Sequence, residues 1–120
     1  MITTSSVRLD GASGHFAPLN YPAIADFQYT KALVEAAEQS GLTYRTGMTA
    51  SSDTFYPGQE ERYDTFIRRA RKELQGSMKE WQSMGVLNYE MESATLLTQG
   101  LSIKQSQIKG IFLTQVNTKV

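Results

Sequence analysis

Residues 2–9 read ITTSSVRL and residues 42–50 read LTYRTGMTA, and the segment between them contains Asp26 and Gly41. Thr, Ser and Val dominate residues 2–9, which lack Gly and Pro, so this stretch favours a strand, and residues 42–50 favour a second one. Asp26 can cap a helix, and Gly41 stands where a glycine commonly ends one. Strand, helix and strand in this order predict a βαβ unit and therefore a largely parallel sheet.

Beyond residue 50 the chain continues to alternate between helical and extended patterns. Met78, Trp81 and Met84 recur at helical spacing, which predicts one apolar helical face packed on the core. The expected segments are a loop over residues 51–59, a helix that starts at the capping box Ser77-Met78-Lys79-Glu80, a strand over residues 86–89 and a helix over residues 94–98. These segments predict the α/β fold class.

Composition limits the chain to one domain of ordinary globular character. It has 120 residues, 40% of them hydrophobic, and a formal net charge of zero, which argues against a nucleic-acid-binding protein. The lack of cysteine excludes disulfide and thiolate chemistry and favours a cytoplasmic location. No apolar run predicts a membrane span, and the single histidine, His15, excludes a histidine-rich metal site.

Two glutamates near the end of the last expected strand are the first candidate site. Glu90 and Glu92 are two residues apart, so on an extended backbone both project to one side, with Met91 opposite. Paired carboxylates can cleave a glycoside, bind a hard metal ion or accept hydrogen bonds from a sugar diol. The alternative is two solvated glutamates near a helix N-terminus, and the spacing alone does not choose.

The loop over residues 54–62 is the second candidate site. Phe55 offers a stacking face, Gln59 both a donor and an acceptor, and Arg62 a rigid donor fork. Together they could recognise the edge of a planar heterocycle. The alternative is a buried aromatic side chain that anchors a polar loop.

Three long blocks carry a resemblance to a known family. They read TASSDTFYPGQ (residues 49–59), GSMKEW (76–81) and MGVLNYEMESATLL (84–97). With SVRLDGAS (6–13) and HFAP (15–18), they closely resemble the uridine-cleaving branch of the nucleoside phosphorylase superfamily. The resemblance runs from the first residues to about Thr98, so we expect a partial nucleoside phosphorylase domain over residues 1–98 and a divergent tail over residues 99–120.

The resemblance implies a fold, a reaction and a set of residues. The fold is a partial three-layer α/β/α sandwich, and the reaction is the phosphorolysis of uridine to uracil and ribose 1-phosphate, in pyrimidine nucleoside catabolism and salvage. It implies a cytoplasmic homo-hexamer with inorganic phosphate as co-substrate, no cofactor, no metal, and no nucleic-acid or membrane partner. Carried over by motif, the residues that bind substrate are Phe55, Gln59, Arg62, Glu90, Met91 and Glu92, with Arg62 and Glu92 as the catalytic pair.

The chain departs from the family pattern at three places. The family has Gln-x-Arg where this chain has Gln59-Glu60-Glu61-Arg62, one residue longer. The family's phosphate-binding residues precede the matched segment, and beyond Thr98 the similarity fades. We therefore expect the chain by itself to have no useful phosphorolysis activity. The alternatives are a non-catalytic remnant of a nucleoside phosphorylase and a purine nucleoside phosphorylase.

Overall fold

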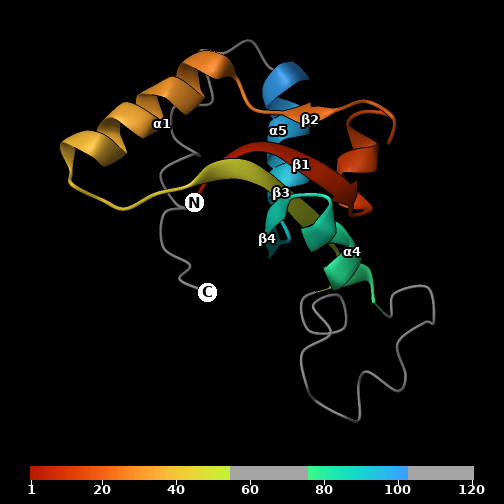
Figure 1. Cartoon of the computed structure of the whole chain (residues 1–120). Helices are drawn as coiled ribbons and strands as arrows, with labels where there is room; N and C mark the ends of the chain where they lie inside the picture. Colours follow the sequence, from red (N-terminus) through yellow and green to blue (C-terminus); the bar gives the residue numbers. More distant parts are fainter. Residues whose placement is uncertain (55–75, 103–120) are drawn as a thin grey trace.

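The computed structural model describes residues 1–54 and 76–102, in which helices flank a four-stranded sheet (Figure 1). The sheet has the order β2-β1-β3-β4. The elements are β1 (Ile2–Leu9), a 3₁₀ turn η1 (Ala12–His15), β2 (Ala23–Ile24), α1 (Phe27–Gln39), β3 (Thr46–Ser52), α4 (Ser77–Ser83), β4 (Val86–Glu90) and α5 (Ser93–Ser102). The predicted α/β class is confirmed.

The predicted βαβ unit is present, because β1 and β3 pair in parallel and α1 connects them. Asp26 caps α1 as expected: its Oδ1 accepts hydrogen bonds from Gln28 N at 2.9 Å and Tyr29 N at 3.1 Å. The second strand begins later than predicted, at Thr46 rather than residue 42. Its first pairing is Thr46 with Ile2, and Ile2 N also donates a 2.8 Å hydrogen bond to the carbonyl of Arg45, the residue before β3.

The edge strand β2 was not predicted from the sequence. It consists of Ala23 and Ile24 alone and pairs antiparallel with Ser6 and Ser5 of β1. Two residues are too few to show the alternating pattern by which a strand is predicted. This strand therefore depends on β1 as its template.

One face of the sheet packs against α4 around a small apolar core. Ala50, Val86 and Tyr89 are buried there, and Met78 and Trp81 of α4 pack against them. These contacts confirm two members of the predicted apolar stripe.

Two details of the α4 prediction are wrong. Ser77 does not act as the N-cap, because Gly76 occupies that position with a left-handed φ of 84° and the cap has no side-chain hydrogen bond. Met84 is 51% exposed rather than part of the core. It follows the last residue of the seven-residue helix, so helical periodicity no longer directs its side chain to the sheet.

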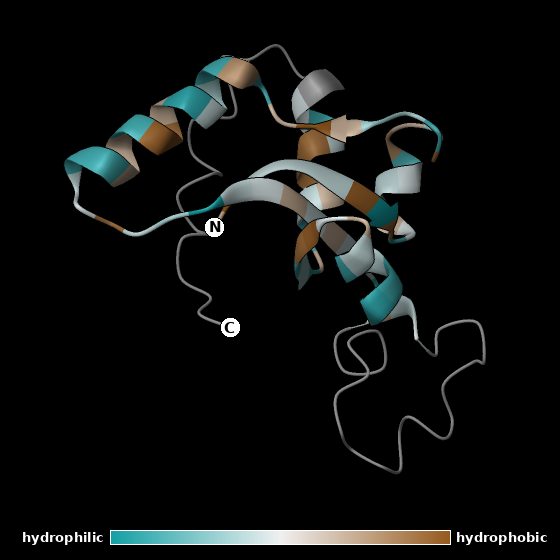
Figure 2. Cartoon of the chain, viewed as in Figure 1, coloured by the Kyte–Doolittle hydropathy of each residue, from teal (hydrophilic) through white to brown (hydrophobic). Residues whose placement is uncertain are grey.

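The opposite face of the sheet carries polar side chains and is covered by α5. Ala94 and Leu97 of α5 are buried, and Ala94 N donates a 2.7 Å hydrogen bond to Ser51 Oγ of β3. Figure 2 shows α5 mostly white and brown, in agreement with the absence of charged residues from Ser93–Ser102. Helix α5 is longer than the predicted helix over residues 94–98. With α4 on one face of the sheet and α5 on the other, the layers have the order α/β/α.

Helix α1 lies to one side of the sheet and buries none of its residues (Figure 1). Among residues 1–54 and 76–102, no helix combines the length and the apolar character that crossing a bilayer requires.

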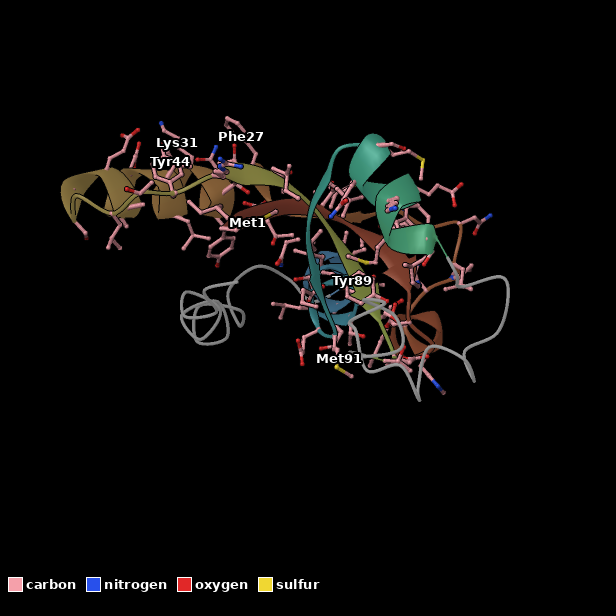
Figure 3. All side chains as sticks on the ribbon, turned by 60° about the horizontal axis from the view of Figure 1, so that its bottom comes forward. Met1, Phe27, Lys31, Tyr44, Tyr89 and Met91 are labelled. Atoms are coloured by element: carbon pink, nitrogen blue, oxygen red, sulfur yellow. The ribbon has the colours of Figure 1, made fainter. Side chains whose placement is uncertain are left out.

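Tyr44 connects the end of the α1 region to the approach to β3, and this contact is expected to depend on pH. Its hydroxyl donates a 2.8 Å hydrogen bond to Glu38 Oε1, and Figure 3 shows Tyr44 beside α1. The hydrogen bond to the Glu38 carboxylate, followed by desolvation and charge repulsion, raises the pKa of Tyr44 above its ordinary value of 10.0. Because the pKa is higher in the folded state, the contact stabilises the protein fully below pH 10.0 and is lost as the pH rises through the folded pKa.

We therefore expect the stability difference between the wild type and Tyr44→Phe to fall when urea unfolding is measured above pH 10 rather than at pH 9. A difference that stays constant between the two conditions would contradict this assignment.

Candidate functional site

The carboxyl ends of β3 and β4 lie side by side at one edge of the sheet. The two strands are parallel, and Ser51 pairs with Glu90. Asp53 and Thr54 follow β3 directly, and Thr54 is the first residue of the predicted base-binding loop. This edge is where open α/β sheets place their ligands.

The Glu90 carboxylate is occupied by hydrogen bonds within the chain. Its Oε2 accepts from Glu92 N at 2.7 Å and from Ser93 N at 2.6 Å, and its Oε1 accepts from the hydroxyl of Ser51. Ser93 N is the first amide of α5 and Glu92 N directly precedes it, at the helix end where N–H groups have no partner within the helix. Glu90 therefore caps α5 from the last position of β4.

A buried pair of hydroxyl groups supports this carboxylate. Ser51 is 0% exposed, and its Oγ lies 2.9 Å from Ser6 Oγ of β1. Ser51 Oγ also accepts from Ala94 N. Through Ser51 Oγ, the hydrogen bonds to Ser6 Oγ, Glu90 Oε1 and Ala94 N join three strands to α5.

Glu92 and Met91 differ from Glu90 because both are exposed. Glu92 Oε2 accepts a 3.2 Å hydrogen bond from Met91 N. Figure 3 shows Met91 projecting away from the end of β4, whereas Tyr89 lies over the sheet. A ligand at this edge can reach Glu92 and Met91 from solvent.

The structure corrects the geometry that the two-residue spacing predicted. The extended backbone ends at Glu90, and Met91 and Glu92 form a bend before α5. The two carboxylates therefore do not project from one continuous strand. Glu90 instead bonds to the backbone of Glu92, so one carboxylate holds the peptide group that carries the other.

The turn after β1 is fixed to the same region by two aspartates that the sequence did not single out. Asp10, 4% exposed, accepts from Ser13 N at 2.7 Å, from Ser13 Oγ at 2.8 Å and from Thr95 Oγ1 of α5 at 3.1 Å. Asp53 accepts from Gly11 N at 3.0 and 3.1 Å. The turn is thus tied to both β3 and α5. An Asp-Gly turn after a strand gives no sequence signal for these distant partners.

Arg8 extends across the loop that follows this turn. Among the described residues, its guanidinium donates to Ser13 Oγ and to carbonyl oxygens of the loop, those of Ala17, Pro18 and Tyr21. The guanidinium is therefore engaged by the protein's own loop.

The remaining predicted site residues lie outside the described part of the chain. They are Phe55, Gln59 and Arg62, together with the extra residue at Glu60-Glu61. Their proximity to Glu90, Met91 and Glu92 stays a prediction. The predicted tail over residues 99–120 is described only as far as Ser102. Within the described ranges, no three potential metal ligands cluster.

Comparison with known proteins matches residues 1–102 to the model of the phosphorylase superfamily. Among similar proteins, the chain is 57% identical to uridine phosphorylase of Escherichia coli (strain K12) and 56% identical to that of Salmonella typhimurium. Each alignment covers 100% of this chain and 48% of the relative. Uridine phosphorylase of Thermococcus kodakarensis is 40% identical over 82% of this chain and 35% of its own length.

The chain spans about half the length of the Escherichia coli and Salmonella relatives it matches. The family match includes every strand described above and the whole of the edge that holds Ser51, Glu90 and Glu92. The chain belongs to the phosphorylase superfamily.

Proposed function

We propose that this chain forms the nucleoside-binding part of an enzyme that cleaves uridine with inorganic phosphate to give uracil and ribose 1-phosphate. The observation that carries the proposal is the β3–β4 edge, where Ser51 pairs with Glu90, Glu92 is exposed beside Met91, and β3 is followed in the sequence by the loop that contains Phe55. The 57% identity to the Escherichia coli uridine phosphorylase supports uridine as the substrate.

The proposed chemistry requires groups on both sides of the glycosidic bond. As the bond breaks, positive charge develops on the sugar and negative charge on the uracil oxygens. A carboxylate such as Glu92 can accept hydrogen bonds from the ribose hydroxyl groups and hold the ring in place for attack. Met91 offers an apolar, polarisable surface next to the sugar.

The base side of the site is assigned to the loop after β3. In the proposal, Phe55 packs on the nucleoside, and Gln59 and Arg62 hold the uracil edge. Arg62 can stabilise the departing base because its guanidinium is a fixed cationic donor. Arg62 and Glu92 are the proposed catalytic pair, and Glu90 contributes to the wall of the ribose pocket.

Inorganic phosphate is the proposed co-substrate, and the proposed reaction needs no cofactor and no metal. The family's phosphate-binding residues precede the matched segment, so the proposed active protein includes a part that supplies them. A homo-hexameric assembly, a cytoplasmic location and a role in pyrimidine salvage complete the proposal and rest on the family resemblance. Neither nucleic acid nor membrane is a proposed partner.

The test combines the chain with the amino-terminal part of the Escherichia coli relative and measures uracil release from uridine and phosphate. We expect turnover by the combined protein and none by the chain alone. Positioning of phosphate against the sugar can account for about 7–11 kcal/mol of a barrier, and that part is expected to come from the added segment. A co-purified assembly that releases no uracil, or that cleaves inosine in preference to uridine, would overturn the proposal.

Gln59→Ala tests the base site in this assembly. Loss of a partner for a desolvated base edge should lower kcat/KM for uridine by about 10-fold to 100-fold. Gln82→Ala is the matched control, because Gln82 is an exposed glutamine on α4. Equal effects of the two substitutions would remove Gln59 from the site.

A further inference from the structure

Glu90 and Glu92 differ in what their carboxylates are free to do. A carboxylate offers about four acceptor positions. Among the described residues, Glu90 uses three of them on Ser51 Oγ, Glu92 N and Ser93 N. Glu92 is exposed, and among the described residues its carboxylate accepts a longer hydrogen bond, 3.2 Å, from Met91 N. The Glu92 carboxylate can therefore accept hydrogen bonds from a sugar, whereas the Glu90 carboxylate holds the backbone amides of Glu92 and Ser93.

The direction of the hydrogen bonds along the buried hydroxyl pair follows from counting protons. A serine hydroxyl has one hydrogen to donate. Ser51 donates it to Glu90, because an ionised carboxylate is an acceptor only. Ser6 Oγ has two acceptors within reach, Ser51 Oγ at 2.9 Å and the Val7 carbonyl oxygen at 3.3 Å, and the shorter distance assigns its hydrogen to Ser51. Ser51 Oγ also accepts from Ala94 N. The chain of donors runs from Ser6 to Ser51 to Glu90, with no reversed arrangement available while Glu90 is ionised.

We propose that Ser51 is a positioning residue that acts through Glu90 to fix the peptide groups of Glu92 and Ser93, and so places the Glu92 carboxylate toward the ribose. The proposal rests on the proposed function and deepens it by separating the two glutamates: Glu92 accepts hydrogen bonds from the ribose hydroxyl groups, whereas Glu90 lines the pocket without accepting from them. Ser6 supports Ser51 from β1, which lies on the far side of β3 from Glu90.

Burial makes this arrangement specific rather than incidental. Ser51 is 0% exposed and Ser6 is 8% exposed, so a lost partner is not replaced readily by water. Replacing Ser51 by alanine would leave both Ala94 N and Glu90 Oε1 without this partner. The carboxylate could then rotate, and the amides that it holds would lose their fixed acceptor.

Amide hydrogen exchange on the full 120-residue chain tests the positioning directly. In Ser51→Ala, the Glu92 and Ser93 amides should exchange about tenfold faster or more, because each loses a well-oriented charged acceptor. Amides of the β1–β3 ladder should change much less. Ser52→Ala is the matched control, since it removes the hydroxyl of the neighbouring serine. Among the described residues, Ser52 Oγ accepts only a 3.3 Å hydrogen bond from Thr54 N. Unchanged exchange at Glu92 and Ser93 would overturn the proposal.

Uridine affinity, measured by titration of the chain, tests whether the positioning serves the site. We expect Ser51→Ala to weaken uridine binding about tenfold in the wild-type background and less than twofold in a Glu92→Gln background. A merely structural residue would weaken binding equally in both backgrounds, and that result would overturn the proposal. Absence of uridine binding by the wild-type chain would count against the proposed function, whereas the exchange experiment would still decide the role of Ser51.

Ser6→Ala provides a second variant if Ser51→Ala does not fold. It removes the donor to Ser51 and leaves the Ser51–Glu90 contact in place. The exchange rates of the Glu92 and Ser93 amides should increase in Ser6→Ala, by a smaller factor than in Ser51→Ala. No change at these amides, with the variant folded, would contradict the proposed chain of donors.

Discussion

Glu90→Ala is expected to lower the free energy of unfolding by about 2–4 kcal/mol, because it removes a charged acceptor shared by three donors. Two of these donors are Ser93 N, the first amide of α5, and Glu92 N, which directly precedes it, so the substitution also removes the helix cap. The third donor, Ser51 Oγ, is buried and would keep a hydroxyl hydrogen without this partner. Urea unfolding followed by circular dichroism measures the loss.

Glu80→Ala is the matched control for this prediction. Glu80 is an exposed glutamate in α4, and its replacement should change stability by no more than about 0.5 kcal/mol. Glu90→Gln should recover only part of the lost stability, because the amide oxygen can accept from the α5 amides but its nitrogen cannot accept from Ser51. Equal stability of Glu90→Ala and Glu80→Ala would contradict the structural role of Glu90.

Arg8→Ala is the second substitution with a large expected effect, about 2–3 kcal/mol of unfolding free energy. The guanidinium joins β1 to the loop through Ser13 Oγ and three backbone carbonyl groups. Without it, that loop loses these contacts with the strand, and chymotrypsin should cleave faster after Phe16 and Leu19, which are both exposed. Urea unfolding and the cleavage rate are measured together.

Arg8→Lys should not restore the wild-type values, because an ammonium group cannot reproduce the planar donor fork. Arg45→Ala is the control: Arg45 is exposed, and its backbone carbonyl, which accepts from Ile2 N, is kept in the substitution. Wild-type stability and cleavage in Arg8→Ala would show that the loop holds its position without the guanidinium.

The candidate site was only partly predictable from the sequence. The sequence singled out Glu90, Met91 and Glu92 as one group, and the structure places them together at the carboxyl edge of the sheet. It could not separate the two glutamates, because spacing shows neither where a strand ends nor which donors lie nearby. The structure separates them through Ser51, 39 positions from Glu90 along the chain.

Local sequence by itself determined the strand over Ile2–Leu9 and the cap at Asp26, since residue type and short-range order govern both. The order of strand, helix and strand also predicted the parallel βαβ unit, because a helical crossover joins parallel strands. Only the tertiary structure decided the start of β3, the two-residue strand β2 and the roles of Arg8, Asp10 and Ser51. Each of these depends on partners distant in sequence: Ser6 and Ser51 are 45 positions apart, and Asp10 and Thr95 are 85 apart. Such contacts form only when the strands are already packed together, so the pairing of buried polar groups follows the fold and cannot be deduced from any one segment.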